Sequence, residues 1–189
     1  LRLPTEAEWQ YACRAGTTDA TYAGPIEIFG ENNAPVLHSI AWYGGNSGVD
    51  FDLDNGVDSS GWPEKQFEHE RAGTRKVALK QPNRWGLFDM LGNVWEWCKD
   101  YWEDDYTGAD ADAVDPSGPP ESHYRVVRGG SWDYDARHVR SAYRSRYDPG
   151  DRTDILGFRC AQVRVEQASE RMSESSGQVV GNDAKPLSE

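Results

Sequence analysis

The sequence predicts a loop-rich globular domain that combines one helix with several short strands around an aromatic core. Its 189 residues are enough to bury one sizeable core. Aromatic residues make up 12% of the chain, while 19 glycines and 10 prolines interrupt it, and this composition argues against a helical bundle. Trp85, Trp95 and Trp97 lie close together in the sequence. Because a Trp side chain buries a large area, we expect the densest part of the core there.

The first predicted element is a helix. Thr5-Glu-Ala-Glu8 is a capping box, in which two side chains satisfy the first free N–H groups of the helix. Trp9 and Cys13 then fall on one helical face, and Gly16 is placed to end the helix. Residues 1–4 are interpreted as the end of a strand. Since a domain rarely begins so close to its first helix, we expect missing upstream residues or a second chain to complete the N-terminus.

Three later stretches have the patterns of strands. Residues 41–43 are apolar and precede a Gly-rich turn. Residues 125–132 favour a strand and contain a double glycine, which permits a close backbone approach or a bulge. A last apolar strand is expected at residues 156–163. The charged stretch that ends at Gly73 predicts an exposed excursion from the core.

Within that excursion, an acidic loop resembles half of a calcium site. Asp50, Asp52 and Asp54 alternate before Gly56, a spacing that directs oxygens inward in calcium loops. The position of the last ligand of such a loop is Gly61 rather than Glu, so the EF-hand pattern fails. A solvated acidic loop is therefore the favoured interpretation, with a calcium site as the minor alternative.

The stretch Gly86–Trp97 predicts a turn followed by a strand. Gly92 and Asn93 tolerate the positive φ of a turn, and the residues from Val94 to Trp97 then alternate as in a strand with one wet and one dry face. Glu96 lies between two Trp residues, where a carboxylate is costly unless something pairs with it. A metal ion bound by turn carbonyls and Glu96 would offset the free-energy cost of burying this carboxylate. The spacing alone favours the other interpretation, with Glu96 on the solvent face.

Charge and cysteine content exclude several classes of partner and site. A formal net charge of -12 argues against binding to nucleic acid or to an anionic membrane. The sequence contains no apolar run of membrane-spanning length and no visible signal peptide, which leaves the cytoplasm and the cell surface open. Cys13, Cys98 and Cys160 have no CxxC spacing and predict neither a disulfide scaffold nor a zinc site. Two of them could still pair while the third stays free.

Two segments lack any hydrophobic period. Residues 103–121 are acidic and rich in Gly and Pro, and they predict a loop. Residues 165–189 have no aromatic side chain and many Ser, Glu and Gly, which predicts a disordered polar tail after a domain at residues 1–164.

Four motifs follow one another in a specific order. They are Arg2-Leu-Pro-Thr-Glu-Ala-Glu-Trp9, Gly86-Leu-Phe-Asp-Met-Leu-Gly-Asn-Val-Trp-Glu-Trp97, Arg128-Gly-Gly-Ser-Trp132 and Gly157-Phe-Arg-Cys-Ala161. Together they resemble the formylglycine-generating enzyme (sulfatase-modifying factor) family. The resemblance implies an α+β fold of the C-type lectin kind, low in regular secondary structure and lacking the family's N-terminal segment. It also implies a structural calcium ion on oxygens of Asp89, Gly92, Val94 and Glu96.

The same resemblance implies a test for enzymatic activity. The family's oxidases bind copper(I) through two cysteines after the Gly-Gly-Ser motif, since soft thiolates suit that ion. Here these positions fall on or near Tyr134 and Val139, and no cysteine lies between residues 99 and 159. Copper is therefore not expected, and no catalytic residue is assigned. Copper-dependent formylglycine generation, which activates sulfatases, remains the alternative, as does the iron chemistry of related oxygenases, whose site needs an upstream domain.

Residues 133–155 differ in composition from the rest of the chain. They contain no Lys, Glu, Gln, Met or Trp, although Glu and Trp are plentiful elsewhere. An Asn codon that ends in a pyrimidine contains two adenines. Substituting any bases for these two adenines can encode every residue type except those five. The bias resembles the variable region of diversity-generating retroelement target proteins, many of which use this fold. The alternative is an ordinary polar loop with an accidental composition.

This stretch also has the chemistry of a binding surface. Tyr134, Tyr143 and Tyr147 offer rigid contact area, and the polar residues offer adaptable hydrogen bonds, as in antibody paratopes. We therefore predict a non-catalytic module that binds a protein or small molecule through one outward patch. Its outward side chains are expected at 133–138, 143, 145, 147, 148, 151 and 153–155. The candidate ligand-binding residues are Asp133, Tyr134, Asp135, Arg137, His138, Tyr143, Ser145, Tyr147, Asp148, Asp151, Thr153 and Asp154.

Three arginines within the stretch are predicted to belong to its framework. Arg140, Arg144 and Arg146 have aliphatic stems that can pack against the core. Their guanidinium groups could line a polar pocket or pair with the excess of carboxylates.

Overall fold

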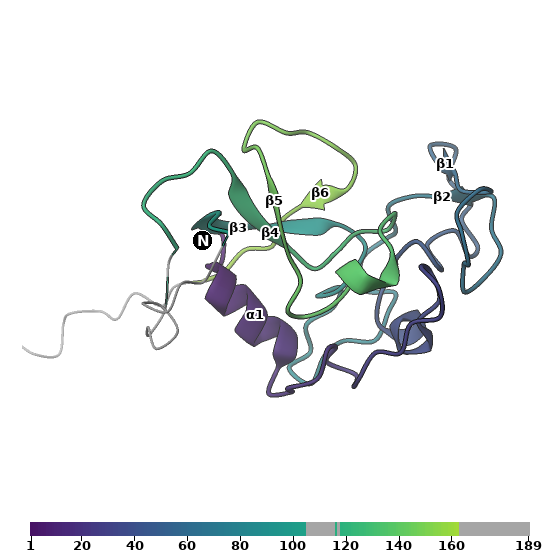
Figure 1. Ribbon diagram of the computed structural model, residues 1–189, viewed down its shortest axis with the longest axis horizontal. Coiled ribbons are helices and arrows are strands. Elements are labelled where there is room, and N and C mark those ends of the chain that lie inside the picture. Colours follow the sequence, from purple (N-terminus) through teal and green to yellow (C-terminus); the bar gives the residue numbers. More distant parts are fainter. Residues whose placement is uncertain (105–115, 117, 163–189) are drawn as a thin grey trace, which may run out of the picture.

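The computed structural model describes residues 1–104, 116 and 118–162. Its regular elements are helix α1 (Glu6–Arg14), the 3-10 helices η1 (Pro35–Ser39) and η2 (Ala136–His138), and strands β1 (Val57–Asp58), β2 (Arg71–Ala72), β3 (Trp95–Tyr101), β4 (Arg125–Arg128), β5 (Arg144–Tyr147) and β6 (Leu156–Gly157). A four-stranded sheet in the order β5-β4-β3-β6 forms the centre, and α1 packs against one of its faces (Figure 1). Strands β3, β4 and β5 are antiparallel, whereas β6 runs parallel to β3. One helix, a small sheet and long irregular connections confirm the predicted α+β class.

Helix α1 forms where the capping box predicts it. The Thr5 hydroxyl accepts a hydrogen bond from the Glu8 N–H at 3.2 Å, and the Glu8 carboxylate accepts one from the Thr5 N–H at 2.8 Å. Trp9 and Cys13 are buried, as the helical period predicts. Ala15 caps the C-terminus in the left-handed conformation with a φ of 47°, so the helix ends just before the predicted glycine.

The two faces of β3 have different surroundings, because successive side chains of a strand point in opposite directions. Glu96 and Asp100 face α1, where Glu96 accepts a hydrogen bond from the Trp9 indole N–H at 2.7 Å. Trp95 and Trp97 point to the opposite, outer face of the sheet. Trp95 is fully buried there. The strand therefore supplies the core on one side and the base of the candidate site on the other.

Residues 41–43 are buried but do not form the predicted strand. The side chain of Asn46 explains the difference. Its amide N–H donates to the Ala41 carbonyl at 3.0 Å, and its Oδ1 accepts from the Tyr43 N–H at 3.0 Å. These bonds use the main-chain groups that a neighbouring strand would need, so the chain turns instead.

The double glycine after β4 allows two close approaches. Gly129 and Gly130 have positive φ angles of 102° and 83°. A Cβ on Gly130 would lie 2.9 Å from Cγ2 of Val139, and a Cβ on Gly129 would lie 3.3 Å from the Met90 carbonyl oxygen. The sequence left a close approach or a bulge open, and the structure has the close approach.

The last predicted strand is shorter than expected. After β6 the chain leaves the sheet, and Phe158 is 68% exposed. Arg2 and Ala161 exchange two backbone hydrogen bonds of 3.1 and 2.8 Å. The first residues of the chain therefore pair with the segment after β6, which agrees with their predicted strand-like character.

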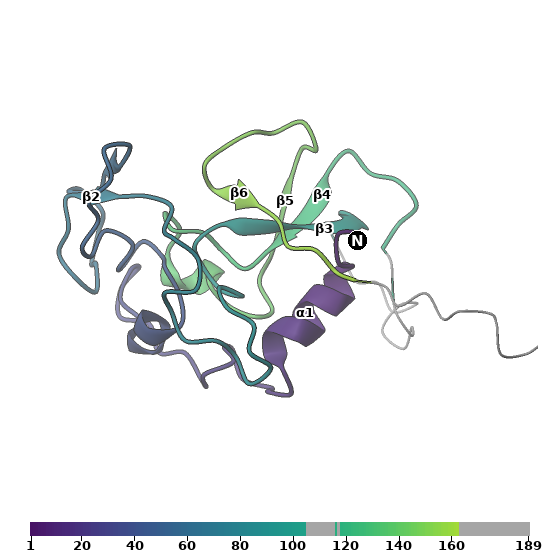
Figure 2. The same ribbon diagram turned by 180° about the vertical axis from the view of Figure 1, so that it is seen from behind.

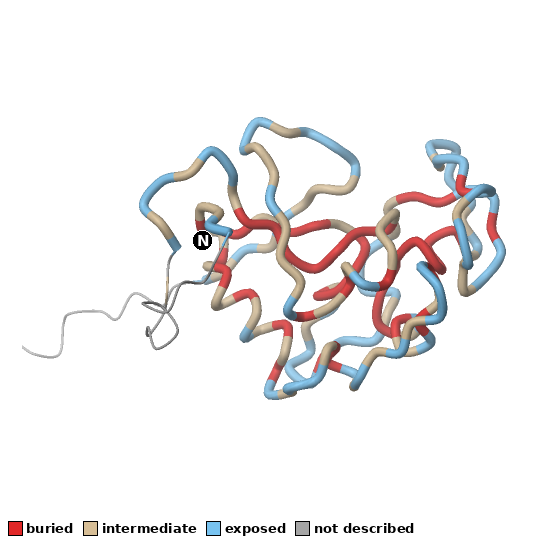
Figure 3. Tube along the Cα trace, in the orientation of Figure 1, coloured by how far each residue is buried: buried red, intermediate tan, exposed pale blue. Residues whose placement is uncertain are grey.

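The long connections contain the exposed excursion that the sequence predicts. Figure 3 shows that the part carrying β1 and β2 is largely exposed, and Asp52 and Asp54 of the acidic loop lie in solvent. In residues 1–104, 116 and 118–162, no group of three or more His, Cys, Asp or Glu side chains is placed to hold a metal ion. Within the same part of the chain, no helix has the length and apolar character needed to cross a membrane. The predicted tail at 165–189 and most of the acidic loop at 103–121 lie outside the described residues.

Candidate functional site

Residues 133–155 lie mainly on the outer face of the sheet. They follow the double glycine, pass through η2 and β5, and then form a loop that arches away from α1 before β6 (Figures 1 and 2). Most of this segment is exposed or half-exposed (Figure 3). The stretch with the unusual composition is therefore largely a surface feature supported by the central sheet.

Four side chains of this segment gather around Trp95. The rings of Tyr134 and Tyr143 lie 5.2 and 6.0 Å from the Trp95 ring, measured between centroids. His138 lies between the two tyrosines, at 5.0 Å from one and 4.6 Å from the other. The hydroxyl of Tyr147 completes the group, 3.0 Å from the hydroxyl of Tyr134. We call these five residues the aromatic cluster.

The aromatic cluster is open to solvent on one side. Its three tyrosines and His138 are half-buried, whereas Trp95 beneath them is fully buried. Burial raises the pKa of the Tyr147 hydroxyl, and the hydrogen bond with Tyr134 raises it further. The Tyr147 hydroxyl therefore remains protonated at neutral pH. One predicted outward position is wrong: Ala136 is fully buried, because η2 turns it into the core.

Strand β5 divides its side chains between the two faces of the sheet. Ser145 and Tyr147 point to the outer face, where the ring of Tyr147 lies 6.5 Å from that of Trp97. Arg144 and Arg146 point to the side of α1. Alternate residues of β5 thus serve the candidate surface and the scaffold respectively.

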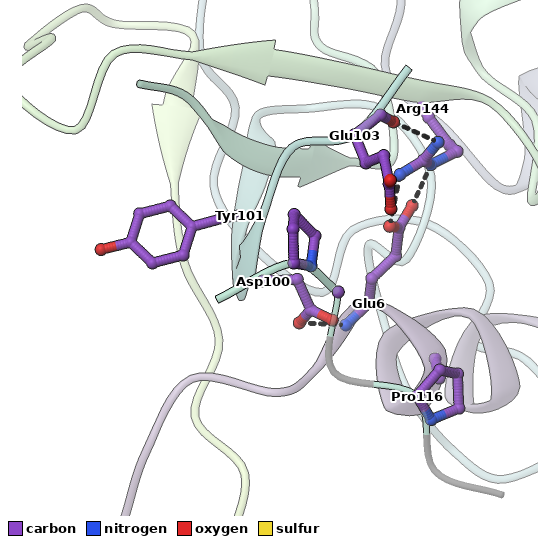
Figure 4. Close-up of a pocket in the computed structure, with 9 residues that line it drawn as sticks. Glu6, Asp100, Tyr101, Glu103, Pro116 and Arg144 are labelled. Carbon is purple, nitrogen blue, oxygen red and sulfur yellow. Dashed lines mark hydrogen bonds and ion pairs between the residues drawn. The ribbon is translucent and has the colours of Figure 1, made fainter. Parts of the chain in front are cut away.

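The scaffold side of β5 is held by ion pairs (Figure 4). Arg144 donates to both carboxylate oxygens of Glu6, at 2.6 and 2.9 Å, and the Glu6 N–H donates to Asp100 at 2.8 Å. The first turn of α1 is therefore tied to both β5 and β3. Arg146 pairs with Asp104 at 2.6 Å. Of the two predicted roles, Arg144 has both, because it pairs with Glu6 and lines the pocket of Figure 4, and Arg146 has the pairing role.

The acidic candidates are divided between η2 and the loop that follows β5. Asp135 caps η2 by accepting from the Arg137 N–H at 3.0 Å, and it also contacts Nδ1 of His138 at 2.7 Å. Asp148 and Asp151 hold the turn after β5, because the Asp151 carboxylate accepts from the Asp148 N–H at 3.1 Å. Both groups of acids thus form hydrogen bonds within their own turns.

Asp133 differs from the other acidic candidates because it is partly buried beside the double glycine. It accepts a hydrogen bond from the hydroxyl of the fully buried Ser131. Burial raises the pKa of the Asp133 carboxyl, against the opposing effect of that hydrogen bond.

The resemblance places the family's copper ligands on or near Tyr134 and Val139, and neither side chain is a thiol. Tyr134 belongs to the aromatic cluster, and Val139 is fully buried against Gly130. A phenol and an isopropyl group do not offer the soft thiolate donors that copper(I) prefers. The geometry of this region is that of an aromatic surface.

The four predicted calcium ligands, Asp89, Gly92, Val94 and Glu96, line one pocket. Arg159 lines the same pocket and donates to both oxygens of Glu96, at 2.5 and 2.6 Å. Glu96 is 6% exposed, so the interpretation that placed it on the solvent face is wrong. Burial raises the pKa of Glu96, against the opposing effect of Arg159.

These residues fit a calcium ion only in part. Calcium takes six to eight oxygen ligands and favours charged ones. The Glu96 carboxylate already accepts from Arg159 and from Trp9, and the Asp89 carboxylate accepts from the Ala78 N–H at 2.7 Å. A calcium ion here would have to share Glu96 with a guanidinium group. The calcium site therefore stays a prediction.

Two contributors to the site have little signal in the sequence. Arg159 enters the sequence analysis only as part of the Gly157–Ala161 motif, yet it pairs with Glu96. A strand carboxylate between two tryptophans implies a distant cation, and the Gly-Phe-Arg motif could have supplied the candidate. Trp95 is expected only as core, yet it forms the base of the aromatic cluster. Its indole N–H is buried without a hydrogen-bond partner among the described residues.

Comparison with known proteins agrees with this geometry. The family model of the sulfatase-modifying factor enzyme 1-like domain matches residues 1–164. The formylglycine-generating enzyme of Streptomyces coelicolor is 36% identical over 163 residues, which cover 85% of this chain and 46% of the relative. That of Bos taurus is 33% identical over 166 residues, which cover 85% of this chain and 38% of the relative. The solved structure of Treponema denticola variable protein 1 has a TM-score of 0.63 and 37% identity, and the match covers 83% of this chain and 45% of that one.

The chain spans less than half the length of these three relatives. The family match nevertheless includes every described residue, and it agrees with the four ordered motifs and with the fold. The chain belongs to the sulfatase-modifying factor enzyme 1-like family, the family of the formylglycine-generating enzymes.

Proposed function

We propose that this chain is a non-catalytic binding module whose binding face consists of the aromatic cluster and the outer side of β5. The observation that carries the proposal is the aromatic cluster, in which half-exposed rings rest on the fully buried Trp95. Rigid aromatic rings provide large contact areas at low entropic cost, and such anchors dominate protein interfaces. A protein or small-molecule ligand would pack on the tyrosine rings and bind their hydroxyl groups.

The alternative function, copper-dependent formylglycine generation, has less support from the chain's own residues. It needs a pair of thiolates near the double glycine, where Tyr134 and Val139 stand instead. The three cysteines are free: Cys13 and Cys98 are buried, and Cys160 is exposed. Cys98 faces α1 by the alternation of β3, away from the aromatic cluster.

The likeness to Treponema denticola variable protein 1 supports a face that varies. That protein is named a variable protein, and the composition of residues 133–155 resembles the variable regions of diversity-generating retroelement targets. Strand β5 offers a physical basis for tolerance to change. Its ion pairs belong to Arg144 and Arg146 on the scaffold side, whereas Ser145 and Tyr147 lie on the outer side. Substitutions on the outer side would leave those ion pairs intact.

A selection with a displayed random peptide library tests the proposed face. Peptides selected on the wild-type protein are measured against a variant with Tyr134, Tyr143 and Tyr147 changed to Ser. The matched control changes Tyr11 and Tyr124, which are 69% and 39% exposed and lie outside the aromatic cluster. We expect at least a 100-fold loss of affinity in the first variant and little change in the control, as interface anchors require.

Circular dichroism would verify that both variants are folded. Selected peptides that bind the cluster variant as tightly as the wild type would overturn the proposed face. The genomic sequence beside the gene tests variability separately. A near-repeat of codons 128–159, with adenines at the differing positions, is the expected result.

A further inference from the structure

A cavity opens beside the aromatic cluster, lined by Trp97 of β3 and by residues of the loop before β6. We call it the β6 cleft and define it by its apolar residues Leu3, Trp97, Leu156 and Phe158 and by Arg125 and Arg152. It connects to the aromatic cluster through Trp97, whose ring lies 6.5 Å from that of Tyr147. This cavity is distinct from the aromatic cluster and from the pocket at Glu96.

The floor and one wall of the β6 cleft are apolar. Trp97 and Leu156 come from the neighbouring strands β3 and β6, and both are half-buried. Phe158 is 68% exposed at the rim. Exposed apolar side chains that gather in a concave site typically mark a place where a ligand binds.

Two cations line the same cleft. The Arg125 guanidinium stacks on the Tyr101 ring at 4.0 Å and donates to the Lys99 carbonyl. Arg152 donates to the carbonyl groups of Asp151 and Pro149, at 2.8 and 3.2 Å. In the described part of the chain, these guanidinium groups bind carbonyl oxygens and have no carboxylate partner. This is notable in a chain with 32 acidic and 20 basic residues.

The one acidic residue that lines the cleft is already engaged. The Asp151 carboxylate accepts from the Asp148 N–H in the turn after β5. The charged lining of the cleft is thus one carboxylate and two guanidinium groups, in a protein with a net charge of -12. This local excess of positive charge favours an anionic ligand.

We propose that the β6 cleft binds a small organic carboxylate with an apolar body. The apolar body packs on Trp97 and Leu156, while the carboxylate binds Arg125 and Arg152. Small-molecule sites are mostly apolar and contain a few polar groups that fix the ligand's orientation. Guanidinium groups match carboxylates in both charge and geometry. The inference rests on the proposed function and names the class of ligand for a cleft that adjoins the binding face at Trp97.

The test uses phenylacetate as the probe and uncharged phenylacetamide as its near-isosteric control. Binding is followed through the indole N–H resonance of Trp97 in the 15N-labelled protein. We expect a saturable shift with phenylacetate and at least tenfold weaker binding of phenylacetamide. Arg152→Gln and Arg125→Gln should each weaken phenylacetate binding about tenfold, as expected for a charge-assisted hydrogen bond. Arg84→Gln, an exposed arginine outside the cleft, should bind like the wild type.

Three results would overturn the inference. The first is a Trp97 resonance that does not saturate with phenylacetate. The second is binding that does not depend on charge, with equal affinity for phenylacetate and phenylacetamide and equal affinity in Arg152→Gln and the wild type. The third is tighter binding of a Phe-terminated peptide amide than of phenylacetate, which would assign the cleft to a protein segment.

The tyrosine variant of the previous section separates the two proposals. If library peptides depend on the tyrosines while phenylacetate fails to saturate, the β6 cleft is assigned wrongly and the binding face stands. If phenylacetate binds through the arginines while the peptides ignore the tyrosines, the proposed face fails.

Discussion

Replacing Arg159 with Met should destabilise the domain by about 3 kcal/mol at pH 7, the lower end of the range for breaking a buried ion pair on one side. Arg159 donates to Glu96 at 2.5 and 2.6 Å and to the carbonyls of Phe88 and Asp89 at 3.1 and 3.2 Å. Its loss leaves a buried carboxylate with the Trp9 indole as the remaining donor. The lower end applies because the Arg159 side chain is 26% exposed, so water can partly replace it.

The loss of stability in Arg159→Met should shrink as the pH falls. Burial already raises the pKa of Glu96, and removing Arg159 removes the main effect that opposes burial. When the folded-state pKa of a carboxyl exceeds its unfolded value of about 4.3, the folded state binds the proton more readily. The stability of the variant therefore rises as the pH falls from its folded pKa toward that unfolded value.

Urea denaturation at pH 7 and pH 5, followed by Trp fluorescence, measures both effects. Arg84→Met serves as the exposed-arginine control. The double variant Glu96→Gln/Arg159→Met should recover much of the lost stability, because it leaves no unpaired buried charge. A cost below about 1 kcal/mol in Arg159→Met, equal at both pH values, is the behaviour of a surface ion pair and would refute the reasoning.

Three further predictions concern metals and thiols. If the predicted calcium ion binds near Glu96, a chelator should lower the melting temperature. Glu96→Gln should remove much of that effect, because calcium favours charged oxygens. A melting temperature that does not change with chelator would contradict the calcium site. A cysteine-containing sulfatase peptide should not be oxidised with or without added copper, since no cysteine lies between residues 99 and 159, where the resemblance places the copper ligands. Turnover above a metal-free blank, measured by mass spectrometry, would contradict this. Ellman's reagent at pH 8 should modify the exposed Cys160 in the native protein and reach the buried cysteines only on unfolding. The reason is that the thiolate is the reactive form, and burial raises the pKa of Cys13 to about 11. Rapid modification of Cys13 in the native protein would contradict this prediction.

The features that the sequence predicts well are local ones. The capping box determines where α1 begins, because its hydrogen bonds join residues that are three positions apart. The alternation around Trp95 and Trp97 predicts β3, and the double glycine predicts either a close approach or a bulge. In each case the physical cause lies within a few residues of its effect.

The features that the sequence leaves open depend on distant partners. Glu96 and Arg159 are 63 positions apart, so no spacing pattern connects them. Residues 41–43 have the composition of a strand, but the side chain of Asn46 takes the main-chain groups that a strand would use. The aromatic cluster likewise combines Trp95 of β3 with four side chains from a later segment. Composition marks that segment as unusual without indicating that its rings meet on Trp95.

The alternation of β5 has a consequence for changes in chain length. A strand that is shifted by one residue presents every side chain to the opposite face. Inserting or deleting a single residue within β5 would turn Arg144 away from Glu6 and direct Tyr147 into the scaffold. The loop at 148–155 has no such constraint, because a few added residues there only widen its arch. If residues 133–155 vary as proposed, β5 tolerates only substitution at alternate positions, whereas the loop before β6 also tolerates changes in length.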